Sequence, residues 1–169
     1  MKRRFPVTML LCLFPDKKLK IMIKINTYTH ENIADDHTKE DIIEFLVESL
    51  EQYGDPKAEI EKAVNYAFGL NNKPGGVVLS AFNTVTQRIA GAVVVNKTGM
   101  EGYIPENILV YIATDKALRG QGLGKRLMQT AIEASEGDMA LHCEPDNPAR
   151  FLYQNLGFTS KYLEMRLKK

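Results

Sequence analysis

Apolar and polar residues follow two different periods along the first third of the chain. They alternate from 21 to 27, which predicts a strand. After Thr38 and Asp41, which approximate a capping box, apolar residues recur at helical spacing until about Gly54. A second helical repeat follows Asp55, a residue suited to cap it. This part of the chain therefore predicts one strand followed by two helices.

The rest of the chain changes repeatedly between strand-like and helix-like patterns. We expect strands at 77–82, 89–95, 108–114, 139–143 and 162–167, and helices at 123–132 and 148–156. A short polar segment separates the first two of these strands, which predicts an antiparallel hairpin. The helix at 123–132 is expected to bury Leu123, Leu127, Met128, Ala131 and Ile132.

Composition bounds the kind of protein but does not name it. A length of 169 residues, with 44% hydrophobic and 25% charged residues, suits one globular domain. The net charge of +1 gives no reason to expect nucleic acid or a membrane as a partner. The only cysteines, Cys12 and Cys143, provide neither a disulfide framework nor a metal-binding spacing. We therefore expect no metal and a reducing, cytoplasmic location.

Acidic residues are concentrated between His30 and Gly69. This segment has eleven Asp or Glu and three Lys, a net charge of −8, and it holds more than half of the 21 acidic residues. One interpretation is that two amphipathic helices carry solvated acidic faces. The other is that the segment attracts a cationic substrate.

The first 21 residues only partly resemble a secretory signal. Lys2, Arg3 and Arg4 precede an apolar stretch at 5–14, but a membrane helix needs about 20 apolar residues and no small-residue cleavage site follows. Met22 begins a run that is typical of a first strand. We therefore expect residues 1–21 to be a leader or a misread upstream start outside the fold.

A glycine-rich segment separates the strand at 108–114 from the next helix. It reads Arg-Gly-Gln-Gly-Leu-Gly-Lys from Arg119 to Lys125, and glycines let successive backbone N–H groups approach an anion at a helix start. A P-loop would need Gly at 119 and Ser or Thr at 126, and both positions hold Arg. A dinucleotide fingerprint from Gly120 would need Gly at 125, which is Lys. The alternative to an anion site is a helix-entry turn whose glycines serve packing.

Two ordered motifs give the chain a family resemblance. Arg119, Gly122 and Gly124 match an Arg/Gln-x-x-Gly-x-Gly/Ala signature, and residues 147–158 are similar to an Asn-x-x-Ala-x-x-x-Tyr-x-x-x-Gly-Phe region with Ala one position early. Through these motifs, residues 22–169 resemble the GCN5-related N-acetyltransferases. The resemblance implies a single α/β (α+β) domain with a central mixed, mostly antiparallel twisted sheet flanked by helices. It also implies a splayed strand pair that holds acetyl-coenzyme A.

The resemblance assigns cofactor contacts to three parts of the chain. Backbone groups of Tyr111, Ile112 and Thr114 would hold the pantetheine arm, because an unpaired strand can add an extended ligand. The diphosphate would lie on the glycine loop, formed by Arg119, Gly120, Gln121, Gly122, Leu123, Gly124 and Lys125. Lys125 or Arg126 would meet the 3′-phosphate, and Asn147 is a further expected contact.

The same resemblance suggests a catalytic pair. Tyr153 occupies the position from which relatives donate a proton to the departing thiolate, and an unperturbed tyrosine with a pKa of ~10 stays protonated at neutral pH. Its alternative is a packed core aromatic. Glu106, thirteen residues before Arg119, is the candidate general base, and its alternative is a solvated residue at the start of a strand.

These observations predict an N-acetyltransferase that moves acetyl from acetyl-coenzyme A to a primary amine by direct attack in a ternary complex. The acceptor is left open among a small molecule, a peptide and a protein. Two alternatives remain: a non-catalytic acyl-coenzyme A sensor and a transferase for a longer acyl group. A homodimer is compatible with the family, but nothing in the sequence indicates the assembly state.

Overall fold

The computed structural model describes residues 22–167 and 169. Their order of elements agrees with the predicted order up to the last helix. The strands are β1 (Ile23–Tyr28), β2 (Gly76–Asn83), β3 (Arg88–Lys97), β4 (Asn107–Thr114) and β5 (Met139–Leu141). The α-helices are α2 (Asp36–Ser49), α3 (Lys57–Ala67), α4 (Leu123–Glu133) and α5 (Arg150–Asn155). The expected leader at 1–21 lies outside the described residues.

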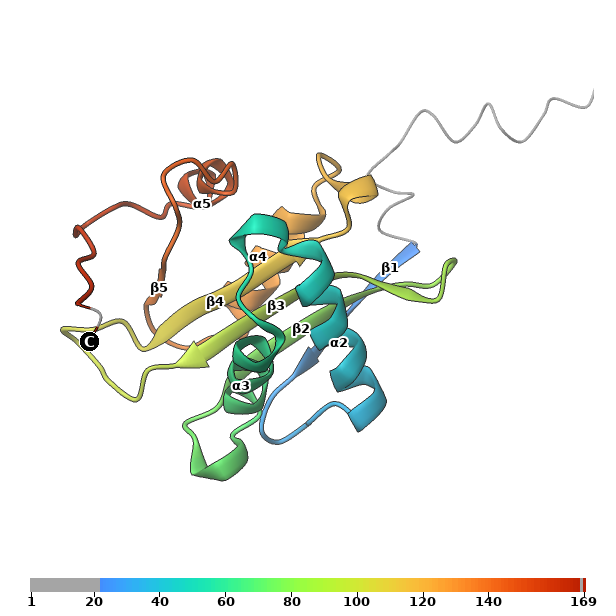
Figure 1. Cartoon of the computed structure of the whole chain (residues 1–169), viewed down its shortest axis with the longest axis horizontal. Helices are drawn as coiled ribbons and strands as arrows, with labels where there is room; N and C mark the ends of the chain where they lie inside the picture. The colour runs from blue at the N-terminus through green and yellow to red at the C-terminus, as the bar shows by residue number, and fades with distance from the viewer. Residues whose placement is uncertain (1–21, 168) are drawn as a thin grey trace, which may run out of the picture.

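The strands form one mixed sheet in the order β1-β2-β3-β4-β5 (Figure 1). The first four strands are antiparallel neighbours, which confirms the hairpin predicted for β2 and β3. Strand β5 runs parallel to β4 and pairs only along Asn107–Leu109. Strand β5 ends at Leu141, the partner of Leu109, so the rest of β4 has no strand partner on this edge and the sheet is open there, as the family resemblance implied. The predicted fold class is confirmed.

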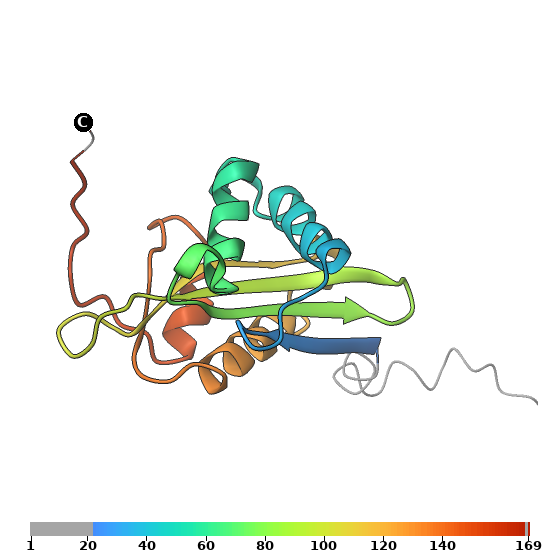
Figure 2. The same cartoon turned by 90° about the horizontal axis from the view of Figure 1, so that it is seen from below.

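Helices cover both faces of the sheet (Figure 2). On one face, α2 and α3 pack their apolar residues on Val78, Ala92 and Val94. On the other face, α4 and α5 pack on the alternate strand residues, including Leu79 and Val93. Full burial of each Leu, Ile or Val contributes about 1.5–3 kcal/mol, so the period-2 alternation of the strands holds both layers in place. No helix of the described residues is long and apolar enough to cross a membrane.

A β-bulge interrupts the pairing of β3 and β4. The register shifts between Val94 and Val95, and consequently two successive residues of β4, Val110 and Tyr111, both pack on the α2 and α3 side. Ile112 then faces the α4 and α5 side. The bulge thus lets two neighbouring residues of β4 share one face of the sheet, where a regular strand would place them on opposite faces.

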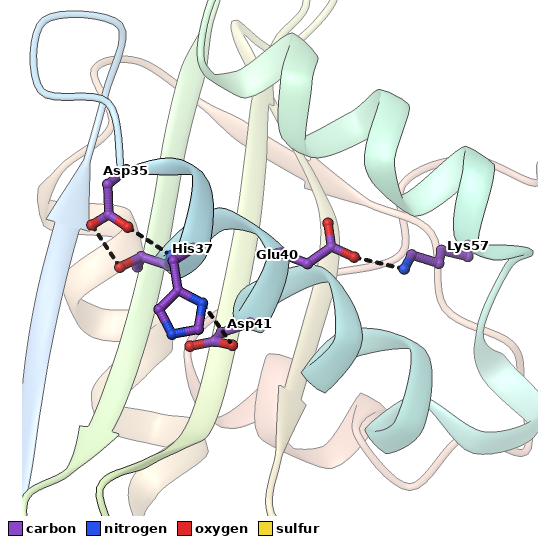
Figure 3. A network of polar contacts seen from close by, with 6 residues as sticks. Asp35, His37, Glu40, Asp41 and Lys57 are labelled. Atoms are coloured by element: carbon purple, nitrogen blue, oxygen red, sulfur yellow. Dashed lines mark hydrogen bonds and ion pairs between the residues drawn. The ribbon is translucent and has the colours of Figure 1, made fainter.

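The N-termini of α2 and α3 differ from the predicted caps. Asp35, not the predicted pair of Thr38 and Asp41, caps α2 by accepting a hydrogen bond from the Thr38 amide at 2.9 Å. Pro56 precedes the first residue of α3 and Asp55 makes no capping bond there. Lys57 instead links the two helices through Glu40 at 2.7 Å (Figure 3) and through Glu44.

The end of the chain also departs from the sequence prediction. Residues 162–167 do not form the predicted strand, and Leu163 and Met165 are almost fully exposed. A strand needs a hydrogen-bonding neighbour, and residues 162–167 pair with no strand among the described residues. Glu164 Oε1 lies 3.7 Å from Nε2 of His142, the residue that follows β5, and this ion pair joins two side chains. Ile132 is likewise 39% exposed, because it lies at the edge of the apolar stripe of α4.

Candidate functional site

The glycine loop connects the end of β4 to the start of α4. Gly120 and Gly122 have φ angles of 74° and 83°, and a Cβ atom at either position would meet no heavy atom within 4 Å. These glycines are therefore required by backbone conformation, not by crowding. The first intrahelical amide donor of α4 is Arg126, which bonds the Gly122 carbonyl at 3.1 Å. The amides of Leu123, Gly124 and Lys125 precede it and have no intrahelical acceptor, which is the arrangement that binds anions.

Side chains of the loop are engaged by the protein itself. Arg119 Nη2 donates to the Ser49 carbonyl at 3.4 Å and lies 3.7 Å from Glu51 Oε1. Gln121 Nε2 donates to the Ala117 carbonyl at 3.0 Å. Both contacts fix the loop against neighbouring elements. The loop consequently presents its backbone, while the Arg119 and Gln121 side chains act as its anchors.

One edge of β4 bonds to β3 in a regular alternation. The amide of Asp115 donates to the Ala90 carbonyl at 2.8 Å, and residues 113 and 111 follow at two-residue intervals in the same register. Hydrogen-bonded and non-hydrogen-bonded pairs alternate in an antiparallel ladder, so the backbone groups of Ala113 and Tyr111 also face β3. The structure therefore does not bring the Tyr111 backbone to the open edge.

The opposite edge of β4 carries the backbone groups of Ile112 and Thr114. By the same alternation, these groups point away from β3, toward the edge along which β5 has already ended. Two unpaired positions thus lead along β4 toward the start of α4. An extended amide-containing molecule could continue the sheet at this edge.

The segment after β5 packs against the same region. A Cβ atom on Gly124 would lie 3.4 Å from Leu152 Cδ2, so the first turn of α4 packs closely on α5. Asn147, which the resemblance placed at the cofactor, accepts a hydrogen bond from the Ala149 amide at 2.9 Å and thereby supports the turn into α5. This contact uses the side-chain oxygen of Asn147 within the protein.

Tyr153 is the most buried titratable side chain on the α4 and α5 face. It is 8% exposed and packs edge-on against Phe158, with ring centroids 6.0 Å apart. Burial first, and the nearby Cys143 thiol second, raise the pKa of Tyr153 to about 12. The hydroxyl is therefore protonated at neutral pH and can donate a proton.

Glu106 is held by backbone amides at the start of β4. Its carboxylate accepts hydrogen bonds from Asp138 at 2.7 Å and from Gly102 at 3.3 Å. Its own amide, then the Asp138 and Gly102 amides, lower the pKa of Glu106 below its usual value. A carboxylate that is stabilised in its charged form is a weaker base. This geometry suits a residue that fixes the turn before β5.

Asp55 and Tyr111 form a pair that the sequence did not indicate. The Tyr111 hydroxyl donates to Asp55 Oδ2 at 2.7 Å across 56 positions of sequence. Burial first and the Asp55 hydrogen bond second raise the pKa of Tyr111. The pair borders an open surface depression of about 370 Å³, called the cavity below, which is lined by Asp55, Glu59, Lys62, Ala63, Tyr66, Asn96, Val110 and Tyr111. The cluster of acidic residues at 30–69 was the only sequence signal that pointed to this side.

Solved structures from several functional classes share this fold. An aminoglycoside antibiotic 6′-N-acetyltransferase from Acinetobacter haemolyticus is 17% identical over 86% of this chain and 97% of its own, with a TM-score of 0.63. An aminoglycoside N-acetyltransferase in complex with CoA is 13% identical over 87% and 94%, with a TM-score of 0.63. A transcriptional regulator from Bacillus halodurans is 20% identical over 87% and 99%, with a TM-score of 0.58. Identities this low show a shared fold alone.

Sequence comparison identifies the family directly. No curated protein matches the sequence significantly. The family model described as the acetyltransferase (GNAT) domain matches residues 74–160, which contain the hairpin, the glycine loop and Tyr153. This match spans more than half of the 169 residues, and the chain therefore belongs to the GCN5-related N-acetyltransferase (GNAT) family.

Proposed function

We propose that the protein transfers acetyl from acetyl-coenzyme A to a primary amine by direct attack in a ternary complex. One observation carries the proposal: the unpaired edge of β4 leads to the N-terminus of α4, where free amides converge. A pantetheine arm and a diphosphate need these two features in this order. No covalent intermediate with the protein is required.

The coenzyme would bind mainly through backbone groups. Ile112 and Thr114 offer amide and carbonyl groups to the pantetheine arm, and the amides from Gly120 to Lys125 surround the diphosphate. Arg126 has a buried Nη1 atom without a hydrogen-bond partner among the described residues, and the 3′-phosphate would provide one. The backbone of Tyr111 faces β3 and is therefore not available to the coenzyme, and its side chain lies on the α2 and α3 side of the sheet.

The proposed chemistry requires an oxyanion donor and a proton donor. A backbone amide near Ile112 would polarise the thioester carbonyl and stabilise the oxyanion that forms as the amine attacks. When the carbon–sulfur bond breaks, the thiolate takes the proton of the Tyr153 hydroxyl. The raised pKa of Tyr153 keeps that proton available at neutral pH.

The attacking amine must also lose a proton, and two routes remain for it. Glu106 was the candidate base, but its two amide hydrogen bonds and lowered pKa favour a structural role. We therefore propose that the proton leaves through water. Under this proposal, Glu106→Gln affects the thermal stability of the turn more than the pH dependence of turnover.

The test is thiol release from acetyl-coenzyme A in the presence of a panel of amines. Tyr153→Phe should lower kcat by about 10²-fold or more, as is typical for loss of a general acid, while the affinity for acetyl-coenzyme A stays unchanged. Tyr162→Phe is the matched control, because this tyrosine is 77% exposed on the chain end. Full turnover in Tyr153→Phe would show that Tyr153 is not the general acid. Tight acetyl-coenzyme A binding without turnover of any amine would favour the sensor instead.

A further inference from the structure

The cavity between α3 and β4 opens on the face of the sheet opposite α4 and α5. Val110 and Tyr111, the two bulge residues that share this side, form part of its wall. Ile112, the next residue, faces the other side, where the coenzyme would bind. The cavity therefore reaches the middle of β4 from the side left free for an acceptor.

The polar lining of this cavity consists mostly of hydrogen-bond acceptors. Asp55 Oδ2 receives the Tyr111 hydroxyl, and Oδ1 makes no hydrogen bond among the described residues. Asn96 Oδ1 is buried and likewise lacks a partner within the part of the chain that the structure describes. The hydroxyl of Tyr66 donates to the Lys97 carbonyl at 2.9 Å, which leaves its oxygen free to accept. Such a lining is complementary to a donor of several hydrogen bonds.

The one cation in the lining is already directed at an acid. Lys62 Nζ lies 2.7 Å from Glu59 Oε1, one turn away on α3, and both side chains are more than half exposed. An exposed pair of this kind is worth at most about 1 kcal/mol, so another cation can replace Lys62 at Glu59. Glu59 and Asp55 thus provide two carboxylates at the cavity.

The wall that carries these carboxylates is held in place. Residues 59, 62, 63 and 66 lie on one face of α3, at the spacing of neighbouring helical positions. Lys57, at the first turn of α3, bridges to Glu40 of α2 (Figure 3) and also to Glu44. The wall is therefore prepared before any molecule binds, which reduces the cost of ordering it.

A second cation, Arg166, feels the charge of Asp55 from the chain end. Figure 2 shows this end passing from the α5 side of the sheet to the α3 side. Glu164 chiefly, and Asp55 at longer range, raise the pKa of Arg166, so the guanidinium feels the charge of Asp55. Arg166 is itself paired with Glu164, so Asp55 keeps its charge for another cation.

We propose that this cavity takes the acetyl acceptor, and that the acceptor is a small molecule with at least two amino groups. The proposal rests on the acetyltransferase function above. An amine that attacks must be neutral, and a carboxylate beside it would keep it protonated. Asp55 and Glu59 are therefore suited to a second ammonium group that does not react. The depression is open and both carboxylates are exposed, so a small acceptor can reach them directly from solvent.

The experiment combines calorimetric binding with turnover for four matched probes: diaminobutane, butylamine, aminobutanol and aminobutanoate. Binding is measured with coenzyme A present, and turnover is measured with acetyl-coenzyme A. Diaminobutane should bind about tenfold more tightly than butylamine, as expected for one charge-assisted contact, and aminobutanoate should bind most weakly. Turnover should follow the same order in kcat/KM.

Three variants on α3 locate the effect. Glu59→Gln should remove most of the preference for diaminobutane over aminobutanol, and Lys62→Gln should increase it about twofold, because a competing cation is lost. Glu61→Gln, on the exposed side of the same helix, should change neither affinity. If Glu59→Gln weakened the binding of diaminobutane and of aminobutanol by the same factor, the proposal would be overturned.

The two measurements separate this inference from the proposed function. Preferred turnover of aminobutanoate or butylamine would sustain the acetyltransferase and overturn the diamine acceptor. Tight binding of diaminobutane without its turnover would sustain the cavity as a cation site and overturn its role as the acceptor site, whereas the acetyltransferase itself would be contradicted only if no amine of the panel were turned over. If diaminobutane neither binds nor is turned over, the proposed diamine site is overturned, whatever the result for another amine.

Discussion

The two sides of β4 present different kinds of surface. Toward α4 and α5, the candidate coenzyme site is formed by backbone groups of the strand edge and the glycine loop. Toward α3, the cavity is lined by side chains, among them Asp55, Glu59 and Asn96. Backbone groups remain when a side chain is substituted, so a site built from them keeps binding the same coenzyme. A site lined by side chains can change its ligand through single substitutions. The difference suggests where cofactor binding is fixed and where acceptor choice can vary.

A change of backbone conformation should have the largest effect and should act on the coenzyme side alone. Gly122→Val places a β-branched residue at a φ of 83° and should weaken acetyl-coenzyme A binding about 100-fold, since the loop must rearrange. Calorimetry with acetyl-coenzyme A measures this loss, and diaminobutane affinity should stay unchanged. Gly102→Val, at a φ of 75° in a loop outside the site, is the control. Equal weakening in both variants would show a general loss of stability.

Alkaline pH should destabilise the α4 and α5 face through its buried tyrosine, Tyr153. The folded pKa of Tyr153, about 12, lies above the unfolded value of ~10, so its contribution to stability is complete below pH 10 and is lost as pH rises toward 12. The loss should be roughly 2 kcal/mol. Urea unfolding at pH 8, 10 and 11.5 measures it. In Tyr153→Phe the free energy of unfolding should fall less steeply with pH above pH 10. If the steepness is unchanged, the loss of stability comes from another group.

Loss of the Tyr111 hydroxyl should affect the α3 side only. Tyr111→Phe removes the donor to Asp55 Oδ2 and should lower stability by about 1 kcal/mol, the usual net value of one hydrogen bond. Binding of diaminobutane should change several-fold because Asp55 loses its orientation, while acetyl-coenzyme A binding should persist. Tyr103→Phe, at a tyrosine that is 82% exposed, serves as the control. A loss of coenzyme binding would contradict the separation of the two faces.

The smallest effect is expected from an anchor of the glycine loop. Arg119→Ala removes contacts to Ser49 and Glu51 at the surface, which should weaken acetyl-coenzyme A binding less than threefold. Lys125→Ala, on the exposed side of the first turn, provides the comparison. A loss of tenfold or more in Arg119→Ala would mean that this side chain contacts a phosphate directly.

Local sequence patterns predicted the parts of the fold that depend on neighbouring residues. The β2 and β3 hairpin, the strand entering the glycine loop and the start of α4 all follow from period, glycine positions and one short turn. The Tyr111 and Asp55 pair joins residues 56 positions apart, and no local pattern encodes such a contact. The same limit explains the wrong terminal strand, since the alternation of 162–167 could not reveal a missing partner. Asp55 was read as a helix cap because its sequence neighbours, and not its tertiary ones, were visible.

The bulge in β4 makes the number of residues in that strand a constrained quantity. Asn107 is tied to Asp138 at one end and Asp115 is tied to Ala90 at the other. Removing one residue between these ties would remove the extra residue of the bulge, so Val110 and Tyr111 could no longer share the α2 and α3 side. Among proteins that share this site, substitutions should therefore be common between 107 and 115, while changes in length should be absent.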